Sequence, residues 1–192
     1  MAKPRVGVLA LQGDFREHII ALCEAGADAV AVKRAEEIRQ CDGLVIPGGE
    51  STTIGMLCQR FGLDEAIYDL HGQGKPIWGT CAGLILLAKE IVASEQWRLG
   101  LLDAEVARNA FGRQVDSFEV DLEMAGVQGG PVRAVFIRAP YVTKVWGNTQ
   151  VLATFEDKIV AVQEGNLLGI AFHPELTADR RVQKYFLSML KG

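Results

Sequence analysis

The sequence lacks several features that mark membrane, secreted and nucleic-acid-binding proteins. No apolar run approaches the length of about 20 residues that a membrane-spanning helix needs. The opening stretch MAKPRVGVLA has neither the long apolar segment nor the cleavage site of a signal peptide. The net charge is −4, so the chain has no overall basic excess for binding nucleic acid. These absences predict a cytoplasmic protein with no membrane and no nucleic-acid partner.

Cysteine and histidine are also scarce, and their spacing does not suggest a metal site. The chain has three histidines and four cysteines, namely Cys23, Cys41, Cys58 and Cys81. None of the cysteines forms a C-x-x-C pair, so a structural zinc site is not expected. A reducing cytoplasm would keep all four as thiols. The first three are expected to pack in or near the core, without an assigned role.

The first half of the chain alternates predicted strands with predicted helices. Its strands are apolar along most of their length, which is typical of a parallel sheet covered on both faces. Asp14 with Glu17 resembles a helix capping box, Gly26 should end that helix, and Ser51 or Thr52 should cap a later one. The expected order is strand 5–11, a helix after residue 14, strands 29–32 and 43–46, helices 51–61 and 64–72, and a strand leading to residue 81.

Beyond about Ser94 the alternation stops, and turn signals separate short strands without crossover helices. Strands are expected at 101–106, 117–122, 132–137, 151–155, 159–164 and 167–172, followed by a helix from about residue 179. This half should be antiparallel or mixed sheet. No linker divides residues 1–192, so we expect a single α/β domain with a doubly wound, mostly parallel sheet and an antiparallel or mixed extension in its C-terminal half.

The segment Gly79-Thr80-Cys81-Ala82-Gly83 joins a predicted strand to a predicted helix. Glycines on both sides of a cysteine are typical of a nucleophile elbow, a tight turn that leaves no space for side chains beside the nucleophile. The alternative interpretation is that Cys81 is a small buried core residue. The segment alone does not decide between the two.

The segment His173-Pro174-Glu175 follows the last predicted strand. Pro174 biases His173 toward an extended conformation, in which Glu175 lies on the same side and can orient the imidazole. A histidine oriented in this way can take a proton from a thiol. The alternative is that His173 merely caps the strand and Glu175 is solvated. The other two histidines, His18 and His71, are expected at the surface or at helix ends.

Six motifs occur in an order that resembles a known family. Together they resemble class I (triad) glutamine amidotransferases, whose three-layer sheet is of the flavodoxin-like type. More closely, they resemble the glutaminase subunit of pyridoxal 5′-phosphate synthase (the PdxT/SNO family), over essentially the whole chain. The motifs are ALQGD at 10–14, PGGEST at 47–52, GTCAG at 79–83, RNAFGRQ at 108–114, FIRAP at 136–140 and HPEL at 173–176.

The resemblance implies hydrolysis of L-glutamine to L-glutamate and ammonia by a Cys81–His173–Glu175 triad, through a γ-glutamyl thioester. Backbone N–H groups of Gly49 and Ala82 are the candidates for the oxyanion hole. No metal and no organic cofactor are implied. The implied substrate-binding residues are Gly48, Gly49, Glu50, Arg108, Ile137 and Arg138, whereas Arg113 would support the structure or a partner contact.

The resemblance also implies a partner. Family glutaminases deliver ammonia to a separate (β/α)₈-barrel synthase subunit that makes pyridoxal 5′-phosphate, in a large hetero-oligomer. They are almost silent until the synthase docks, and we expect the peptide at Pro47-Gly48-Gly49 to be the movable part.

Three other interpretations remain open from the sequence. The chain could be the glutaminase of another synthase, such as imidazole glycerol phosphate synthase. It could be a cysteine-elbow protein of the DJ-1/PfpI type, although the H-P-E triplet weighs against this. It could also be a binding module that keeps only the fold, which the intact set of Cys81, His173 and Glu175 disfavours.

Overall fold

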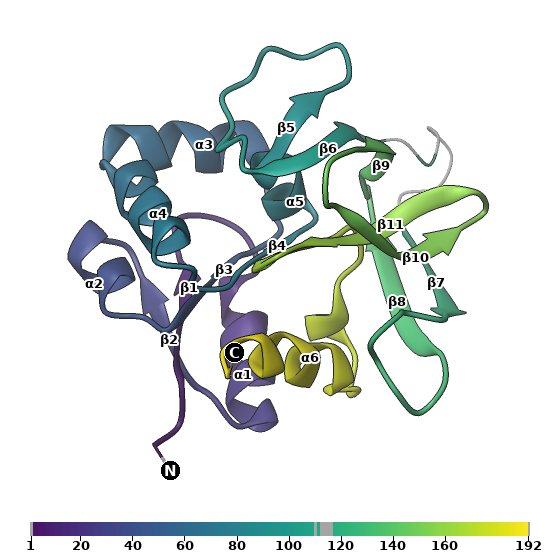
Figure 1. The fold of residues 1–192 in the computed structure, drawn as a ribbon, viewed down its shortest axis with the longest axis horizontal. Coiled ribbons are helices and arrows are strands. Elements are labelled where there is room, and N and C mark those ends of the chain that lie inside the picture. Colours follow the sequence, from purple (N-terminus) through teal and green to yellow (C-terminus); the bar gives the residue numbers. More distant parts are fainter. Residues whose placement is uncertain (1, 110, 112–116, 192) are drawn as a thin grey trace.

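The computed structural model describes residues 2–109, 111 and 117–191. A twisted sheet runs through the molecule with helices on both faces (Figure 1). Its strand order is β2-β1-β3-β4-β12-β11-β9-β6-β5, and β10 pairs with β11 outside this path. A separate hairpin is formed by β7 (Ser117–Leu122) and β8 (Val132–Ile137).

The first five strands of this order are all parallel, as expected from their apolar sequences. Cα partners Ile46 and Gly79 link β3 to β4, and Gly79 and Gly169 link β4 to β12. The carboxyl ends of these three strands therefore meet at one edge of the sheet, where α/β proteins bind their ligands. The five strands are β1 (Arg5–Leu9), β2 (Asp28–Val32), β3 (Gly43–Ile46), β4 (Ile77–Thr80) and β12 (Leu167–Ile170).

The remaining strands make the predicted mixed extension. Pairing is antiparallel between β12 and β11, β11 and β9, β9 and β6, and β10 and β11, whereas β5 and β6 are parallel. Strands β5 and β9 were not expected from the sequence. The extension contains β5 (Ala88–Ile91), β6 (Leu102–Ala107), β9 (Tyr141–Val145), β10 (Gln150–Phe155) and β11 (Lys158–Glu164).

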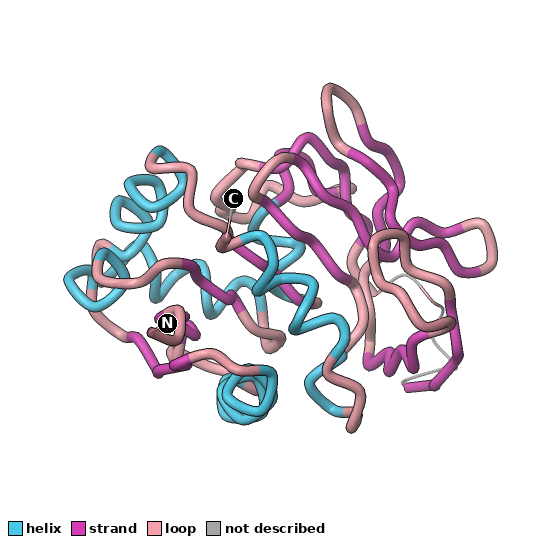
Figure 2. The backbone as a smooth tube through the Cα atoms, turned by 60° about the horizontal axis from the view of Figure 1, so that its bottom comes forward, coloured by secondary structure: helices cyan, strands magenta, loops and turns pink. Residues whose placement is uncertain are grey.

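Helices cover the parallel part of the sheet on both faces. The pair α1 (Phe15–Ala25) and α6 (Arg181–Met189) lies on one face (Figure 1). The opposite face carries α3 (Ser51–Arg60), α4 (Leu63–Gly72) and α5 (Ala82–Leu87), with the unpredicted short α2 (Ala35–Arg39) beside α4. Figure 2 shows this helical half and, beside it, the extension of strands and loops. The three layers are those expected from the sequence.

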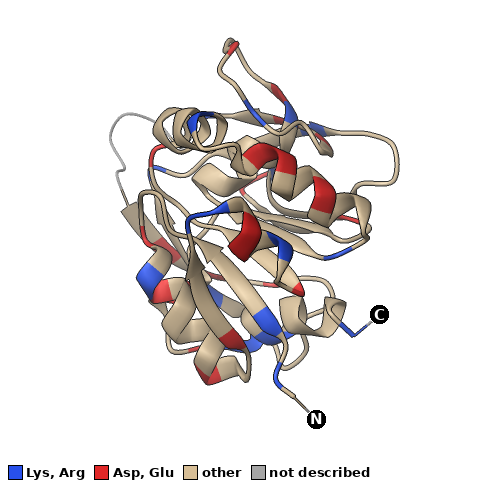
Figure 3. Cartoon of the chain, turned by 90° about the vertical axis from the view of Figure 1, so that its left-hand side faces the viewer, with Lys and Arg blue, Asp and Glu red and all other residues tan. Residues whose placement is uncertain are grey.

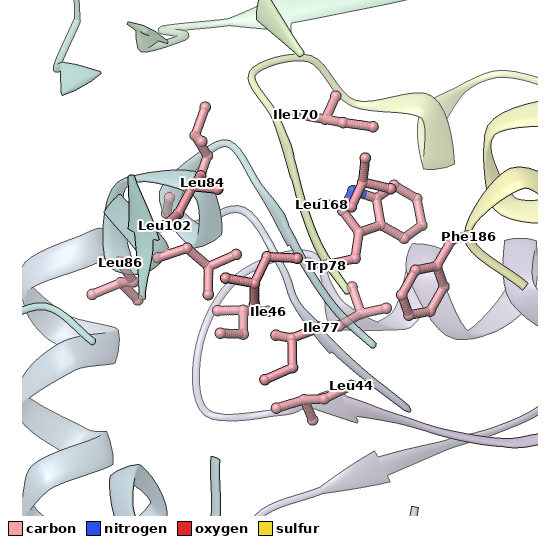
Figure 4. Packing of buried hydrophobic residues seen from close by; sticks show 14 of the residues in the cluster. Leu44, Ile46, Ile77, Trp78, Leu84, Leu86, Leu102, Leu168, Ile170 and Phe186 are labelled. Atoms are coloured by element: carbon pink, nitrogen blue, oxygen red, sulfur yellow. The ribbon is translucent and has the colours of Figure 1, made fainter. Parts of the chain in front are cut away.

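The core lies between these layers, and Trp78 of β4 stands at its centre. The indole is fully buried and contacts Phe186 of α6, with ring centroids 5.4 Å apart. Figure 4 shows Leu168 of β12 beside this pair, and Leu84 of α5 on the other side of the strands. Burial of one such large apolar side chain stabilises the fold by about 1.5–3 kcal/mol.

Two of the expected helix caps are wrong. Asp14 lies at the N-cap position of α1 but makes no side-chain cap hydrogen bond, because its carboxylate contacts His173 instead. The N-cap of α3 is Glu50, whose carboxylate accepts from the backbone N–H groups of Thr52 and Thr53. The expected end of α1 is confirmed, since Gly26 adopts a left-handed conformation there.

The surface is mixed in charge. Lysine and arginine residues are interspersed with acidic residues on the face shown in Figure 3. In the part of the chain that the structure describes, no helix is both long enough and apolar enough to span a bilayer.

Candidate active site

Cys81 occupies a strained turn between β4 and α5. Its backbone has φ 51° and ψ −105°, and its N–H donates to the carbonyl of Ile170 at 2.8 Å. The flanking glycines are required by backbone packing. A Cβ on Gly83 would collide with the carbonyl oxygen of Ile46, and a Cβ on Gly79 with the carbonyl oxygen of Gly83. This geometry is that of a nucleophile elbow.

His173 follows β12 and is buried together with Glu175. Its Nδ1 atom lies 2.6 Å from Oε1 of Glu175, and both residues are 5% exposed. The chain turns into η1 (Pro174–Leu176) after His173, so it is not extended through Glu175 as expected. The two side chains meet nevertheless, and Glu175 is not a solvated acid.

The ends of β4 and β12 bring Cys81 to His173. Burial alone would lower the pKa of His173, but hydrogen bonds with Asp14, Cys81 and Glu175 outweigh it and raise that pKa. Two neighbouring parallel strands therefore place a thiol beside an imidazole that a buried carboxyl group orients.

A second carboxylate, not assigned to the site from the sequence, also faces His173. Oδ2 of Asp14 lies 3.1 Å from His173 Nδ1, and the Asp14 N–H donates to the carbonyl of Gly48 at 3.3 Å. Burial would raise the pKa of Asp14, but hydrogen bonds with His173 and Glu175 hold it well below its usual range. Burial raises the pKa of Glu175, and the hydrogen bond with Asp14 adds to this effect.

The expectation that His18 lies at the surface or at a helix end is wrong, because its side chain is completely buried. Its Nε2 atom lies 2.9 Å from Oγ1 of Thr80 and 3.5 Å from Oε2 of Glu175, and the ring stands edge-on to Trp78. Burial lowers the pKa of His18 to about 4, so the ring is neutral at pH 7. The four-residue spacing between His18 and the apolar Leu22 was a sequence signal for this inward orientation.

One group of residues has the donor types of a metal site. Asp14, His18 and Glu175 each offer one ligand atom, and these atoms lie within 4.8 Å of one another. The same side chains contact His173 and Thr80 at hydrogen-bond distances. We interpret the group as a hydrogen-bond network around His173, and the absence of a metal from the chemistry stays a prediction.

A pocket of about 260 Å³ opens beside Cys81. Small-molecule sites begin at about 300 Å³, so this pocket suits a compact ligand. Six of the seven expected substrate-binding and oxyanion residues line it, all except Gly48. Ser51, Ile85 and Asn109 also line it, although they were not assigned to the site from the sequence. The lining is Gly49, Glu50, Ser51, Cys81, Ala82, Ile85, Arg108, Asn109, Ile137 and Arg138.

Gly48 lies beside Cys81 and His173, although it is not part of the pocket lining. A Cβ at this position would come within 2.6 Å of Cε1 of His173 and 3.4 Å of Cβ of Cys81. A glycine is therefore needed where the loop after β3 passes Cys81 and His173.

Three non-glycine residues that line the pocket have positive φ angles. The φ angles are 51° at Cys81, 48° at Asn109 and 43° at Arg138. These values lie in the left-handed region, which residues other than glycine seldom adopt. Such strain is typical of positions where the surrounding structure fixes a functional geometry.

Glu50 uses its carboxylate mainly to shape the loop. Its oxygens accept from the N–H and hydroxyl groups of Thr52 and Thr53, which lower its pKa to about 2. Its own N–H donates to Oε1 of Gln12 at 2.7 Å. Glu50 is implied to bind the substrate by the family resemblance, and these contacts show that its carboxylate also supports the loop.

Only part of the RNAFGRQ motif falls within the described residues. Arg108 is exposed at the pocket, and its Nη1 atom donates to Oε1 of Gln96. Arg113 and Gln114 lie outside the described residues, so the role expected for Arg113 stays a prediction.

A nucleophile elbow after one strand and a His-x-Glu pair after its neighbour define the class I, or triad, type of glutamine amidotransferase expected from the motifs. The model of the SNO glutamine amidotransferase family matches residues 8–191. The chain belongs to this family.

Individual relatives agree with this assignment. The chain is 56% identical over 186 residues to the pyridoxal 5′-phosphate synthase subunit PdxT of Moorella thermoacetica, covering 97% of this chain and 99% of that protein. It is 57% identical over 187 residues to the protein of the same name from Brevibacillus brevis, covering 97% of each. A crystal structure described as a glutamine amidotransferase is 49% identical, with a TM-score of 0.92 and coverage of 97% and 99%. The predicted family and fold class are confirmed.

Proposed function

We propose that this chain hydrolyses L-glutamine with Cys81, His173 and Glu175 and supplies the ammonia to a pyridoxal 5′-phosphate synthase subunit. The observation that carries the proposal is that Cys81 and His173 both lie against Gly48 beside a compact pocket, with Nδ1 of His173 held by Glu175 at 2.6 Å. Family membership and the names of the relatives support the choice of substrate and pathway. The whole chain acts as one glutaminase domain in the cytoplasm.

In the first half of the reaction, Sγ of Cys81 attacks the side-chain carboxamide carbon of glutamine, and His173 takes the thiol proton. A carbon–sulfur bond forms and the carbonyl π-electrons move to oxygen, giving a tetrahedral intermediate. The carbon–nitrogen bond then breaks as His173 returns its proton to the leaving nitrogen. The products of this half are ammonia and a γ-glutamyl thioester on Cys81.

In the second half, His173 takes a proton from water, and the water oxygen attacks the thioester carbon. The carbon–sulfur bond breaks, glutamate leaves and the sulfur regains a proton. Glu175 keeps the imidazole oriented through both halves, since its carboxyl group holds Nδ1 and leaves the other nitrogen for proton transfer.

The tetrahedral oxyanion needs preorganised donors, and we assign the backbone N–H groups of Gly49 and Ala82. Both residues line the pocket beside Cys81. The Gly48 carbonyl accepts from the N–H of Asp14 at 3.3 Å, so rotation of the Gly48–Gly49 peptide would break this bond and redirect the Gly49 N–H. We assign this peptide as the part that moves when the synthase docks.

The remaining expected residues bind glutamine and shape the pocket. Arg108 and Arg138 bring positive charge to the pocket, which suits the α-carboxylate, while Glu50 and Ile137 form part of its walls and Gly48 lies beside Cys81 and His173. The partner in this proposal is a (β/α)₈-barrel subunit in a large hetero-oligomer, which consumes the ammonia before it escapes to solvent.

The proposal is tested by measuring ammonia release from glutamine, with and without the synthase subunit. The wild-type chain should be almost silent alone and active with its partner, and Cys81→Ala should remove the activity. Cys58→Ala is a suitable control, because Cys58 is also a buried free thiol but lies on α3. Ammonia release that survives in Cys81→Ala would refute the mechanism. High activity of the wild-type chain alone would refute the assignment of the movable peptide.

A further inference from the structure

Gln96 lies behind the pocket and joins two of its walls. Its Oε1 atom accepts a hydrogen bond from Nη1 of Arg108, and its Nε2 atom donates to Oγ of Ser51 at 3.1 Å. Both partners line the pocket, whereas Gln96 does not. Ser51 is 4% exposed and begins α3, so the side-chain amide ties an exposed arginine to a fixed point in the fold.

The backbone of Gln96 is itself fixed in place. Its N–H donates to Oγ of Ser94 at 3.3 Å, and its carbonyl accepts from Nη1 of Arg98 at 3.0 Å. The Nε atom of Arg98 in turn donates to the carbonyl of Lys89 in β5 at 2.7 Å. The side chain of Gln96 therefore projects from an anchored segment, which is what a residue needs in order to orient another.

We propose that Gln96 is a positioning residue that holds the Arg108 guanidinium at the pocket, where it binds the α-carboxylate of glutamine. This inference deepens the proposed function and rests on it. Arg108 has a long side chain that would otherwise sample many rotamers, and fixing it before the substrate arrives lowers the entropic cost of binding. Gln96 acts through Arg108 and does not touch the reacting carboxamide.

The chemistry of the amide explains why a glutamine suits this position. A neutral carbonyl oxygen occupies one N–H group of Arg108 and leaves its positive charge uncompensated for the substrate. A glutamate at position 96 would also hold Arg108, but it would neutralise the guanidinium and repel the incoming carboxylate. Gln96→Ala and Gln96→Glu therefore test different parts of the inference.

The test measures binding in a Cys81→Ala background, with the synthase subunit present, by titration calorimetry. L-Glutamine is compared with L-glutaminamide, in which a neutral amide replaces the α-carboxylate. We expect Gln96→Ala to weaken the binding of glutamine roughly tenfold, which corresponds to the loss of one hydrogen bond to a charged group. Binding of glutaminamide should change less than twofold. Gln96→Glu should weaken glutamine binding at least as much, although it keeps a partner for Arg108.

In the active enzyme, KM for glutamine should rise in both variants while kcat stays within about twofold, a separation that general loosening of the fold would not produce. Gln59→Ala, on the exposed face of α3, is the matched control and should change neither constant. Equal loss of glutamine and glutaminamide binding, or unchanged glutamine binding in Gln96→Ala, would overturn the positioning role. Failure of the Cys81→Ala complex with native Gln96 to bind glutamine would instead refute the proposed function.

Discussion

Nε2 of His18 lies 3.5 Å from Oε2 of Glu175, and both side chains are completely shielded from solvent. The contact extends the triad from Cys81 through His173 and Glu175 to a fourth buried residue. Nε2 of His18 also lies 2.9 Å from the hydroxyl oxygen of Thr80, the residue before Cys81. The chain of contacts thus returns to the elbow, so His18 braces the triad from behind.

Replacement of His18 should change how stability depends on pH. Burial lowers the pKa of His18 to about 4 in the folded state, whereas an unfolded histidine titrates near 6.5. Between these values the unfolded chain binds a proton that the folded chain does not, so His18 destabilises the fold as the pH falls from about 6.5 to 4. The full effect is about 3 kcal/mol, and His18→Gln should remove it.

The measurement is the free energy of unfolding in urea, for wild type and His18→Gln, at several pH values from 7.5 to 4.5. Asp14, His173 and Glu175 titrate in both proteins, so their contributions largely cancel in the difference. The variant should lose stability more slowly than wild type as the pH falls. Parallel curves would mean that His18 does not stay neutral in the folded chain.

Local sequence patterns predicted Cys81 and His173 as candidate site residues. Both follow buried strands, and flanking glycines or a neighbouring acid mark each of them. His18 and Asp14 belong to the same network, but their contacts cross long sequence separations. Asp14 lies 159 positions from His173 along the chain, and His18 lies 62 from Thr80.

Contacts between residues far apart in the sequence also limited the prediction of the fold. The parallel strands were predicted because each is apolar on both faces, and that pattern is local. Strands β5 and β9 were missed because both are short, partly polar and partly exposed, and both depend on pairing with β6. Asp14 was interpreted as a helix cap since the position is right for one, but the nearby imidazole competes for its carboxylate.

Asp14→Asn should reduce glutamine hydrolysis without preventing folding. The substitution keeps the shape of the side chain but removes the charge 3.1 Å from Nδ1 of His173. A hydrogen bond to a charged group contributes about 1.5–3 kcal/mol, so we expect kcat to fall roughly 10- to 100-fold. Glu175→Gln should lower kcat further than Asp14→Asn does, because the contact of Glu175 with His173 is shorter and buried. The rates are measured as ammonia release in the presence of the synthase subunit.

Glu17→Gln is the control for this prediction, since Glu17 carries the same charge in the first turn of α1 but is exposed. Its rate should equal that of wild type. A rate for Asp14→Asn that also equals wild type would show that Glu175 alone orients His173.

Glu50→Ala should separate the capping role of Glu50 from catalysis. The carboxylate accepts from the N–H groups of Thr52 and Thr53, and loss of such a cap typically costs about 1 kcal/mol. Because the folded-state pKa of Glu50 is lowered to about 2, its contribution is complete above pH 4.5 and is lost as the pH falls toward 2. Urea unfolding at pH 7 measures the cost. If KM for glutamine rises while stability is unchanged, Glu50 contacts the substrate and does not act as a cap.

Gly83→Ala should destabilise the fold far more than the same change at another helical glycine. A Cβ at position 83 would overlap the backbone carbonyl oxygen of Ile46 in β3, and neither backbone can move without disturbing the sheet. Overpacking of this kind typically costs about 1–3 kcal/mol of stability. Because the backbone of Ile46 is held in the sheet, we expect Gly83→Ala to cost about 3 kcal/mol or more.

Gly72 in α4 is the control. It has open space around it and no positive φ angle, so Gly72→Ala should be neutral or stabilise the fold by up to about 1 kcal/mol. Urea unfolding of both variants measures the contrast. Equal stabilities would mean that α5 can move away from β3, and the close approach that positions Cys81 would then not be a rigid feature of the elbow.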